Sequence, residues 1–273
     1  MPLDPTEAFA QERRERIGRY PNSALARAAQ AFMQASTPDR YSYNFTWLGR
    51  PIIQYPQDIV AMQELIWWVK PDLIIETGIA HGGSLILSAS MLALLDYAEA
   101  SAIGESLDPR EARRRVLGVD IDIRAHNFAA IKAHPMSNRI EMLQGSSIQP
   151  EIIAAVWKRA ASFNRILVSL DSNHTHAHVL SELKAYAPLV SMGSYCVVFD
   201  TIIEDLPGEM YPDRPWSRGN NPKTAVREYL KEIGAEEPVG ADGVGLAFEV
   251  DGALEAKLLM TVAPDGYLRR LPK

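Results

Sequence analysis

The chain has 273 residues, of which 47% are hydrophobic and 23% are charged, and its formal net charge is -6 at pH 7. These values are typical of a soluble globular protein, and the acidic balance argues against nucleic acid as a partner. The single cysteine, Cys196, excludes an intrachain disulfide and a cysteine-based zinc site. Since the N-terminus has no apolar core and the apolar runs are short, we expect no signal peptide, no membrane span and a cytoplasmic location.

The first part of the chain, residues 1–55, is predicted to be an N-terminal extension that packs on the core. Residues 6–35 are rich in Ala, Arg and Gln and predict two helices, and the aromatic, proline-bounded residues 41–56 predict an irregular segment. A helix follows to residue 69, with apolar side chains at helical spacing, and Pro71 ends it. Residues 56–273 are then expected to form the main domain.

From residue 73 onward, predicted strands and helices alternate. The strands are expected at residues 73–76, 116–120, 140–143, 165–170 and 195–199, followed by a final pair at 244–250 and 256–263. The helices are expected at residues 84–95, 126–133, 150–161, 177–187 and 224–233, with a charged insertion at 96–115 and a long loop at 201–222. This alternation predicts an α/β fold with a mostly parallel sheet and helices on both of its faces.

The stretch from Glu76 to Ser84 reads Glu-Thr-Gly-Ile-Ala-His-Gly-Gly-Ser and lies between the first of these strands and its helix. Open α/β sheets bind nucleotide-like ligands at such turns. Gly78 permits a backbone conformation closed to other residues, and Gly82 lets the chain pass close to a ligand. The acidic first position suits a cationic or amino group better than a pyrophosphate. S-adenosylmethionine (SAM) carries an amino group and a sulfonium, although an ordinary strand–helix turn would also contain glycine.

Polar residues also follow the next two strands, and parallel strands deliver these ends to one crevice. Asp120 is placed to accept hydrogen bonds from a ribose diol, or to cap a helix, as Asp122 also could. Ser146 and Ser147 could bind the adenine edge or cap the following helix, and the sequence leaves both readings open.

Two carboxylates end the neighbouring fourth and fifth strands, Asp171 and Asp200. Buried carboxylates repel each other unless one is protonated or a cation lies between them, and hard oxygen ligands favour Mg²⁺ or a similar ion. Glu204 could add a ligand from the loop or could be a solvated charge. His174 would lie beside such a metal and could act as a general base. His176 and His178 open a helix, where alternate residues spread around the axis, so a three-histidine zinc site is not favoured.

Several motifs together resemble the cephalosporin hydroxylase family, which includes cephamycin-type SAM-dependent O-methyltransferases. They are Trp47-x-Gly-x-Pro51, Lys70-Pro-Asp-Leu-Ile-Ile-Glu-Thr-Gly78, His81-Gly-Gly-Ser84, Gly118-Val-Asp-Ile-Asp122, Asp171-Ser-Asn-His174 and Val198-Phe-Asp-Thr201. The resemblance implies a Rossmann-like class I methyltransferase fold, with a seven-stranded sheet that ends in an antiparallel pair. It also implies a Mg²⁺ site on Asp171 and Asp200 with His174 as the base. Phe199 stands where some relatives have Glu, which leaves Thr201, Glu204 or water to complete the metal shell.

These observations predict methyl transfer from SAM to a hydroxyl of a small polar acceptor, a sugar or secondary metabolite. Glu76, Gly78, Gly82 and Ser84 would hold the methionine end of SAM, and residues 203–222 would form a lid. Two alternatives remain: a metal-dependent hydroxylase or hydrolase, and a non-catalytic SAM-binding partner of a tailoring enzyme. The sequence leaves open whether the chain forms a homo-oligomer.

Overall fold

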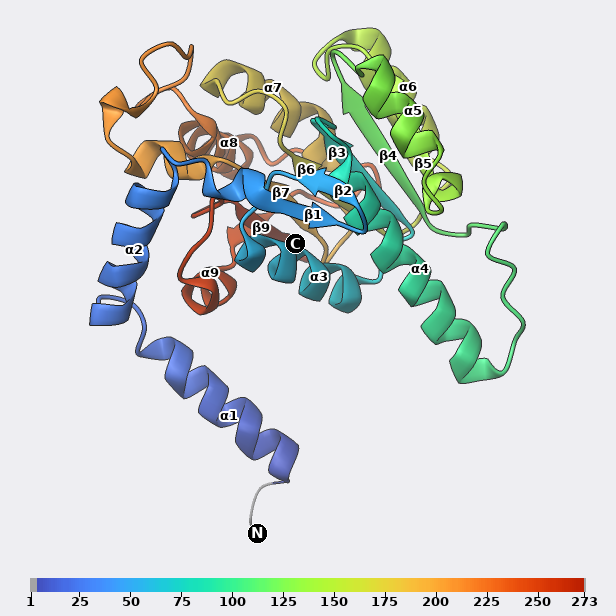
Figure 1. Cartoon of the computed structure of the whole chain (residues 1–273), viewed down its shortest axis with the longest axis horizontal. Coiled ribbons are helices and arrows are strands. Elements are labelled where there is room, and N and C mark those ends of the chain that lie inside the picture. Colours follow the sequence, from blue (N-terminus) through green and yellow to red (C-terminus); the bar gives the residue numbers. More distant parts are fainter. Residues whose placement is uncertain (1–3, 273) are drawn as a thin grey trace.

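The computed structural model describes residues 4–272 and is built around a seven-stranded sheet with the strand order β5-β4-β3-β6-β7-β9-β8 (Figure 1). The strands are β3 (Leu73–Thr77), β4 (Arg115–Asp120), β5 (Ile140–Gln144), β6 (Ile166–Leu170), β7 (Tyr195–Val198), β8 (Phe248–Val250) and β9 (Tyr267–Arg270). The first five are parallel to one another, and β9 runs antiparallel to both β7 and β8. The predicted α/β class, with its mostly parallel sheet and antiparallel final pair, is confirmed.

Helices cover both faces of this sheet. They are α3 (Pro56–Val69), α4 (Gly83–Ile103), α5 (Ala125–Lys132), α6 (Pro150–Ala160), α7 (His176–Tyr186), α8 (Pro222–Glu236) and α9 (Gly252–Leu258). Alternate strand residues face opposite ways, so Ile74 joins a core with α3 and α4, while Ile75 joins a core with α6, α7 and α8. Glu76, two residues after Ile74, points to the α3 and α4 side at the carboxyl end of β3.

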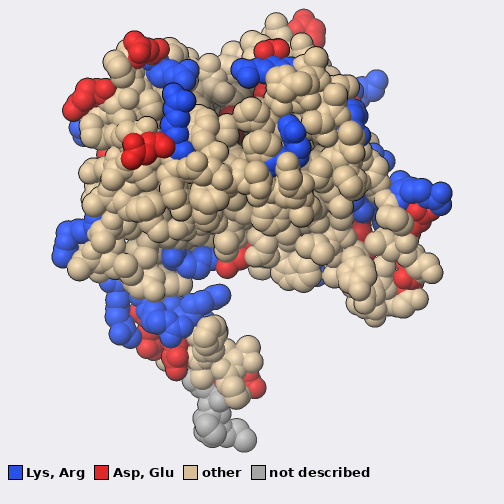
Figure 2. All heavy atoms as spheres, viewed as in Figure 1, with Lys and Arg blue, Asp and Glu red and all other residues tan. Residues whose placement is uncertain are grey.

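The two predicted N-terminal helices are present as α1 (Pro5–Gly18) and α2 (Ala24–Ser36). Figure 1 shows α1 projecting from the body, and Figure 2 shows charges of both signs crowded on this projection. No residue of α1 is buried, and its pair Glu12–Arg16 has the i,i+4 spacing that supports a solvated helix. Helix α2 instead buries Ala29 and Met33.

The prediction of an irregular segment at residues 41–56 is wrong in part. After a short 3₁₀ turn, Tyr41–Asn44, the strands β1 (Phe45–Trp47) and β2 (Arg50–Ile52) form an antiparallel hairpin. Its two central residues, Leu48 and Gly49, have φ of 44° and 86°, the positive values that a tight hairpin turn requires. The turn was not predicted because Leu-Gly is a weaker hairpin signal than Asn-Gly.

Helix α4 is longer than predicted and extends through the first part of the expected charged insertion. Asp96 lies inside the helix and is buried, which is tolerated because it forms ion pairs with Arg114 and Arg139. The helix ends where Gly104 takes the left-handed conformation, with φ of 70°. By length and composition α4 could cross a membrane, contrary to the expectation of short apolar runs, but half of its most apolar window is buried in the protein.

The predicted final strand at residues 256–263 is also wrong. Asp251 caps α9 by accepting a hydrogen bond from the backbone N–H of Leu254, so the chain is helical up to Leu258. The last strand is β9, which begins after the turn at Asp265 and Gly266. Gly266 is required there, since a Cβ would lie 2.1 Å from the carbonyl oxygen of Val198 in the sheet.

Candidate active site

Three polar side chains gather at the carboxyl ends of β6 and β7. Within residues 4–272, Asp171, His174 and Asp200 form a group whose potential metal-ligating atoms all lie within 4.8 Å of one another. The Nε2 atom of His174 is 3.2 Å from Oδ2 of Asp200. Asp200 has φ of 56°, a conformation that Asp adopts more readily than most residues and that turns the chain out of the strand. The two carboxylates suit Mg²⁺ or Mn²⁺, which prefer oxygen ligands, so they fit the divalent cation predicted for this edge, with the imidazole of His174 beside them.

The surroundings of Asp171 favour a cation because they are strongly negative. Burial raises the pKa of its carboxyl well above the usual range, and the nearby charges of Asp200 and Glu76 raise it further. One neutral group contacts this carboxylate: Nε2 of Gln54 donates a hydrogen bond to Oδ2 at 3.2 Å. A bound cation would therefore attract the carboxylates of Asp171 and Asp200, which otherwise repel each other.

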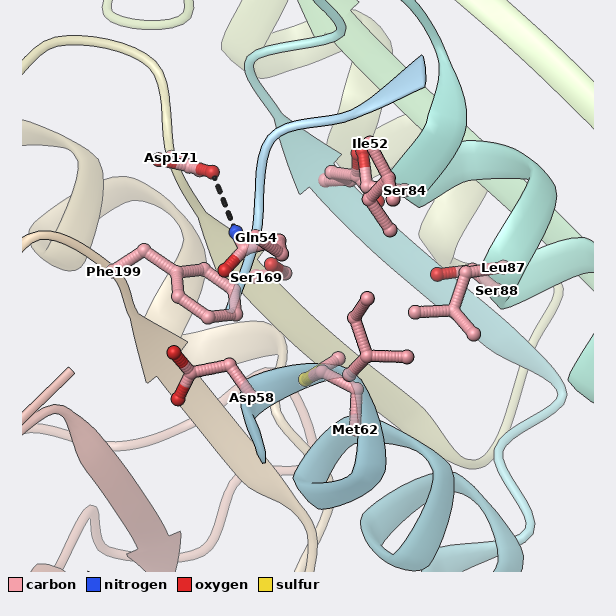
Figure 3. Close-up of a pocket in the computed structure, with 12 residues that line it drawn as sticks. Ile52, Gln54, Asp58, Met62, Ser84, Leu87, Ser88, Ser169, Asp171 and Phe199 are labelled. Carbon is pink, nitrogen blue, oxygen red and sulfur yellow. Dashed lines mark hydrogen bonds between the residues drawn. The ribbon is translucent and has the colours of Figure 1, made fainter. Parts of the chain in front are cut away.

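A small cavity lies next to this group, between the sheet and helices α3 and α4 (Figure 3). Glu76 lines it from β3 and accepts a short hydrogen bond from the Ser84 hydroxyl at the start of α4. Burial raises the pKa of Glu76 to about 7, despite this hydrogen bond. The wall toward β7 is Phe199, which occupies the position where relatives were expected to offer a carboxylate. The structure thus brings Glu76 and Ser84 together, as the sequence predicted, next to Asp171.

The glycines of the β3–α4 turn make room mainly for other parts of this chain. Gly78 has φ of 90°, and a Cβ there would lie 2.0 Å from the carbonyl oxygen of Asp171. At Gly82, with φ of 84°, a Cβ would meet the Ile131 side chain at 2.4 Å. The expectation that Gly82 allows a ligand to approach therefore stays a prediction, since its immediate neighbour is α5.

The carboxylate of Asp120 holds the same turn. Its Oδ2 accepts hydrogen bonds from the backbone N–H groups of Ile79, at 2.7 Å, and Ala80, at 3.2 Å. Its Oδ1 accepts one from Asp122, at 3.0 Å. These bonds are neither a helix cap nor a ribose contact, because they connect the end of β4 to the turn after β3. Ribose binding by the remaining lone pairs of Asp120 stays a prediction.

Replacing Asp120 with alanine is expected to weaken SAM binding about 10- to 100-fold. The two turn N–H groups would lose a charged acceptor, and such bonds contribute about 1.5–3 kcal/mol each. Calorimetric titration with SAM measures the effect. Asp122→Ala serves as the matched control and is expected to stay within about threefold of the wild type, because its carboxylate is exposed. Equal losses in both variants would contradict the assignment.

Ser147 is buried and lies in a polar network rather than at a helix cap. Its hydroxyl is 3.0 Å from Nε2 of His178, which is also 3.2 Å from the hydroxyl of Ser172. Ser172 in turn donates to the buried carboxylate of Glu182 at 2.7 Å. Ser146 is more accessible, and its backbone N–H donates to Gln149. Contact of either serine with adenine stays a prediction.

The structure gives Thr201 and Glu204 partners other than the cluster of Asp171, His174 and Asp200. The Thr201 hydroxyl is buried and donates to the carbonyl oxygen of Pro264 at 2.7 Å. Glu204 accepts from the backbone of Gly219 at 2.7 Å and from Asn221 at 2.6 Å. Burial alone would raise the pKa of Glu204, but these two hydrogen bonds hold it below its usual value. Glu204 therefore anchors the base of the 203–222 loop.

The other two histidines of the triplet turn away from the cluster of Asp171, His174 and Asp200. His176 pairs with Thr224 and Glu228 of α8, and His178 belongs to the serine network. Gln54 and Asp58, which were not predicted from the sequence, also line the cavity. Their sequence signal was weak: Gln54 lies among aromatic residues and prolines ahead of α3, and Asp58 lies in the first turn of α3, each more than a dozen positions before β3.

Residues 39–271 match the family described as rhamnosyl O-methyltransferase/CmcI. The rhamnosyl O-methyltransferase of Mycobacterium leprae (strain TN) is 28% identical over 226 residues, which cover 82% of each chain. That of Mycobacterium tuberculosis (strain CDC 1551 / Oshkosh) is 27% identical over 226 residues, covering 82% of this chain and 78% of the other.

Two solved structures share the fold. An O-methyltransferase from Bacillus cereus in complex with S-adenosylhomocysteine (SAH) has a TM-score of 0.51 and 13% identity, covering 93% of this chain and 92% of its own. The structure of CmcI with Mg and SAM has a TM-score of 0.50 and 18% identity, covering 84% and 77%. The family match spans far more than half of the sequence. The chain therefore belongs to the rhamnosyl O-methyltransferase/CmcI family and is a SAM-dependent O-methyltransferase.

Proposed function

We propose that this protein methylates a hydroxyl of a sugar, or of a sugar-bearing secondary metabolite, with the assistance of a divalent cation. The observation that carries the proposal is the meeting of Asp171, His174 and Asp200 at the sheet edge, next to the cavity that contains Glu76. Its curated relatives are rhamnosyl O-methyltransferases, which supports a sugar hydroxyl as the acceptor.

The two carboxylates of this group, Asp171 and Asp200, would hold the cation. When bound, SAM supplies a methyl group on a positively charged sulfur, and Mg²⁺ supplies positive charge that lowers the pKa of a nearby hydroxyl. Asp171 is oriented by the hydrogen bond from Gln54, and Asp200 by its turn after β7. Together they fix where the acceptor oxygen would approach, so that the hydroxyl and the methyl group can line up.

His174 removes the proton from the acceptor hydroxyl. Its Nε2 lies 3.2 Å from Asp200, whose negative charge stabilises the imidazolium that forms. The ring also packs against Trp216, whose ring centroid lies 4.8 Å away in an edge-to-face arrangement with an interplanar angle of 86°. With its proton taken by His174, the acceptor oxygen would be able to accept the methyl group that SAM supplies.

Residues 203–222 form the lid over this group. Trp216 reaches His174 from the loop, and the guanidinium of Arg214 lies 5.1 Å from the Trp216 ring centroid. Asn221 closes the loop with a capping box on α8, and its amide also bonds to Glu204. A loop tied at both ends and aromatic at its centre is suited to excluding water from the transfer step. We also propose that residues 1–55 are an N-terminal extension that packs on the 56–273 domain and that the enzyme works in the cytoplasm.

Calorimetric titration with SAM, with and without Mg²⁺, tests the proposal most directly. SAM is expected to bind, and incubation with Mg²⁺ and a panel of rhamnosyl glycosides is expected to yield SAH and a product heavier by one methylene group. Absence of SAM binding, together with iron or zinc retained through purification, would favour the hydroxylase or hydrolase alternative. SAM binding without turnover of any acceptor would favour a non-catalytic partner.

A further inference from the structure

Gln54 lines the cavity that contains Glu76 and contacts Asp171 there (Figure 3). It follows the β1–β2 hairpin, is 6% exposed, and its Nε2 donates to Asp171. A carboxylate that holds a cation can accept hydrogen bonds but cannot donate one, so the amide must present its nitrogen to Asp171. The carbonyl oxygen, Oε1, then points away from Asp171, and it is buried without a hydrogen-bond partner among residues 4–272.

A buried acceptor without a donor is costly, and native proteins rarely leave one unexplained. The cavity around Gln54 also contains the Glu76 carboxylate, for which Ser84 is the donor in the structure. A third cavity carboxylate, Asp58, already accepts from Thr261, Val262 and Tyr267. The cavity groups that can still accept hydrogen bonds are therefore Gln54 and Glu76. The carboxyl groups of Asp58, Glu76 and Asp171 line the same cavity and make it negative.

We propose that the cavity binds the α-ammonium group of the SAM methionine end, with Gln54 Oε1 and the Glu76 carboxylate as its acceptors. This inference rests on the proposed SAM site and names a residue for it, Gln54, outside the glycine turn. The ammonium group has three N–H donors and a positive charge, which match two acceptors in a negative environment. The cavity has room for about one group of the size of a water molecule, which suits an ammonium but not a whole amino acid.

The same amide then connects the two halves of the active site. Its nitrogen orients Asp171 toward the cation, while its oxygen receives the cofactor. Gln54 is therefore a cofactor-binding residue that also positions a metal ligand.

The experiment compares two ligands by calorimetry: SAH, and its analogue in which hydrogen replaces the α-amino group. The wild-type protein is expected to bind SAH about 10- to 100-fold more tightly than the analogue, the range expected for hydrogen bonds to a charged group. Gln54→Met, close in shape but without the amide, is expected to lower SAH affinity about tenfold and to leave affinity for the analogue within about threefold. The ratio between the two ligands should therefore shrink.

Gln57→Met is the matched control. Gln57 is a nearby glutamine of α3 whose side-chain oxygen also has no partner in the described part of the chain, but it does not line the cavity, so its substitution should leave the ratio unchanged. If Gln54→Met lost affinity for SAH and for the analogue equally, Gln54 would have a purely structural role. If it lost affinity for neither ligand, Gln54 would have no role in binding, and either result would overturn the inference. Failure of the wild-type protein to bind SAH would instead overturn the proposed function. Glu76→Gln provides a second test, because it should reduce the same ratio without involving Gln54.

Discussion

Replacing Asp171 with asparagine is expected to lower kcat about a thousand-fold while SAM affinity stays within about threefold of the wild type. Asparagine keeps the size of the side chain and an oxygen for the Gln54 hydrogen bond, but it loses the negative charge that binds the cation. Without the cation, the acceptor hydroxyl keeps its high pKa and His174 alone must remove its proton. Steady-state kinetics for turnover and calorimetry for SAM separate the two quantities.

Asp122→Asn is the control for this substitution, since it removes a carboxylate from an exposed position at the same edge of the sheet. It should leave both kcat and SAM affinity near the wild-type values. If Asp171→Asn lost SAM binding and turnover to the same extent, the cofactor and metal halves of the site would be assigned to the wrong residues.

Replacing Asp58 with alanine is expected to lower the free energy of unfolding by about 4 kcal/mol at pH 5. The Asp58 carboxyl group is fully buried, and its oxygens accept hydrogen bonds from the hydroxyls of Thr261 and Tyr267 and from the backbone of Val262. Each buried donor left without an acceptor costs about 1–3 kcal/mol. Denaturant unfolding measures the change, and Asp39→Ala, at an exposed position, is expected to stay within about 0.5 kcal/mol.

This loss should depend on pH. Burial raises the pKa of Asp58 to about 6 in the folded protein, above its ordinary value of 3.8. The folded state then binds the proton more tightly than the unfolded state, so the contribution of Asp58 to stability declines as the pH rises through 6. The difference between the wild type and Asp58→Ala should therefore be about 1 kcal/mol smaller at pH 7.5 than at pH 5. A difference that grew over this range would contradict the buried, protonated state.

The parallel sheet was readable from the sequence because each of its strands is a short apolar run bounded by turn residues. The same logic placed Glu76, Asp171 and Asp200 at one edge, since parallel strands end on the same side. The C-terminal strand pair was harder to predict. The apolar run at residues 256–263 is compatible with a strand, but equally with the end of a helix followed by a turn, which is what the structure has. There the cap at Asp251 decided the outcome, and its hydrogen bond to Leu254 depends on local geometry.

Long-range contacts could not be predicted from the sequence, because they join residues that lie far apart in the chain. Asp96 reads as the start of a solvated insertion until Arg114 and Arg139 are known to lie beside it. Likewise Gln54 has no local pattern that connects it to Asp171, more than a hundred residues later. Glu204 could be recognised as a polar loop residue, but its partners in the loop, Gly219 and Asn221, are set by the folded loop.

The contact between Gly83 and the hairpin affects how this enzyme could be shortened. A Cβ on Gly83 would lie 2.2 Å from the carbonyl oxygen of Pro51, so the first turn of α4 is shaped around the β1–β2 ribbon. Ile52, at the end of that ribbon, is also a wall of the cavity. A truncated chain that began at residue 56 would therefore open this cavity to solvent, and we expect the smallest active fragment to start ahead of the ribbon.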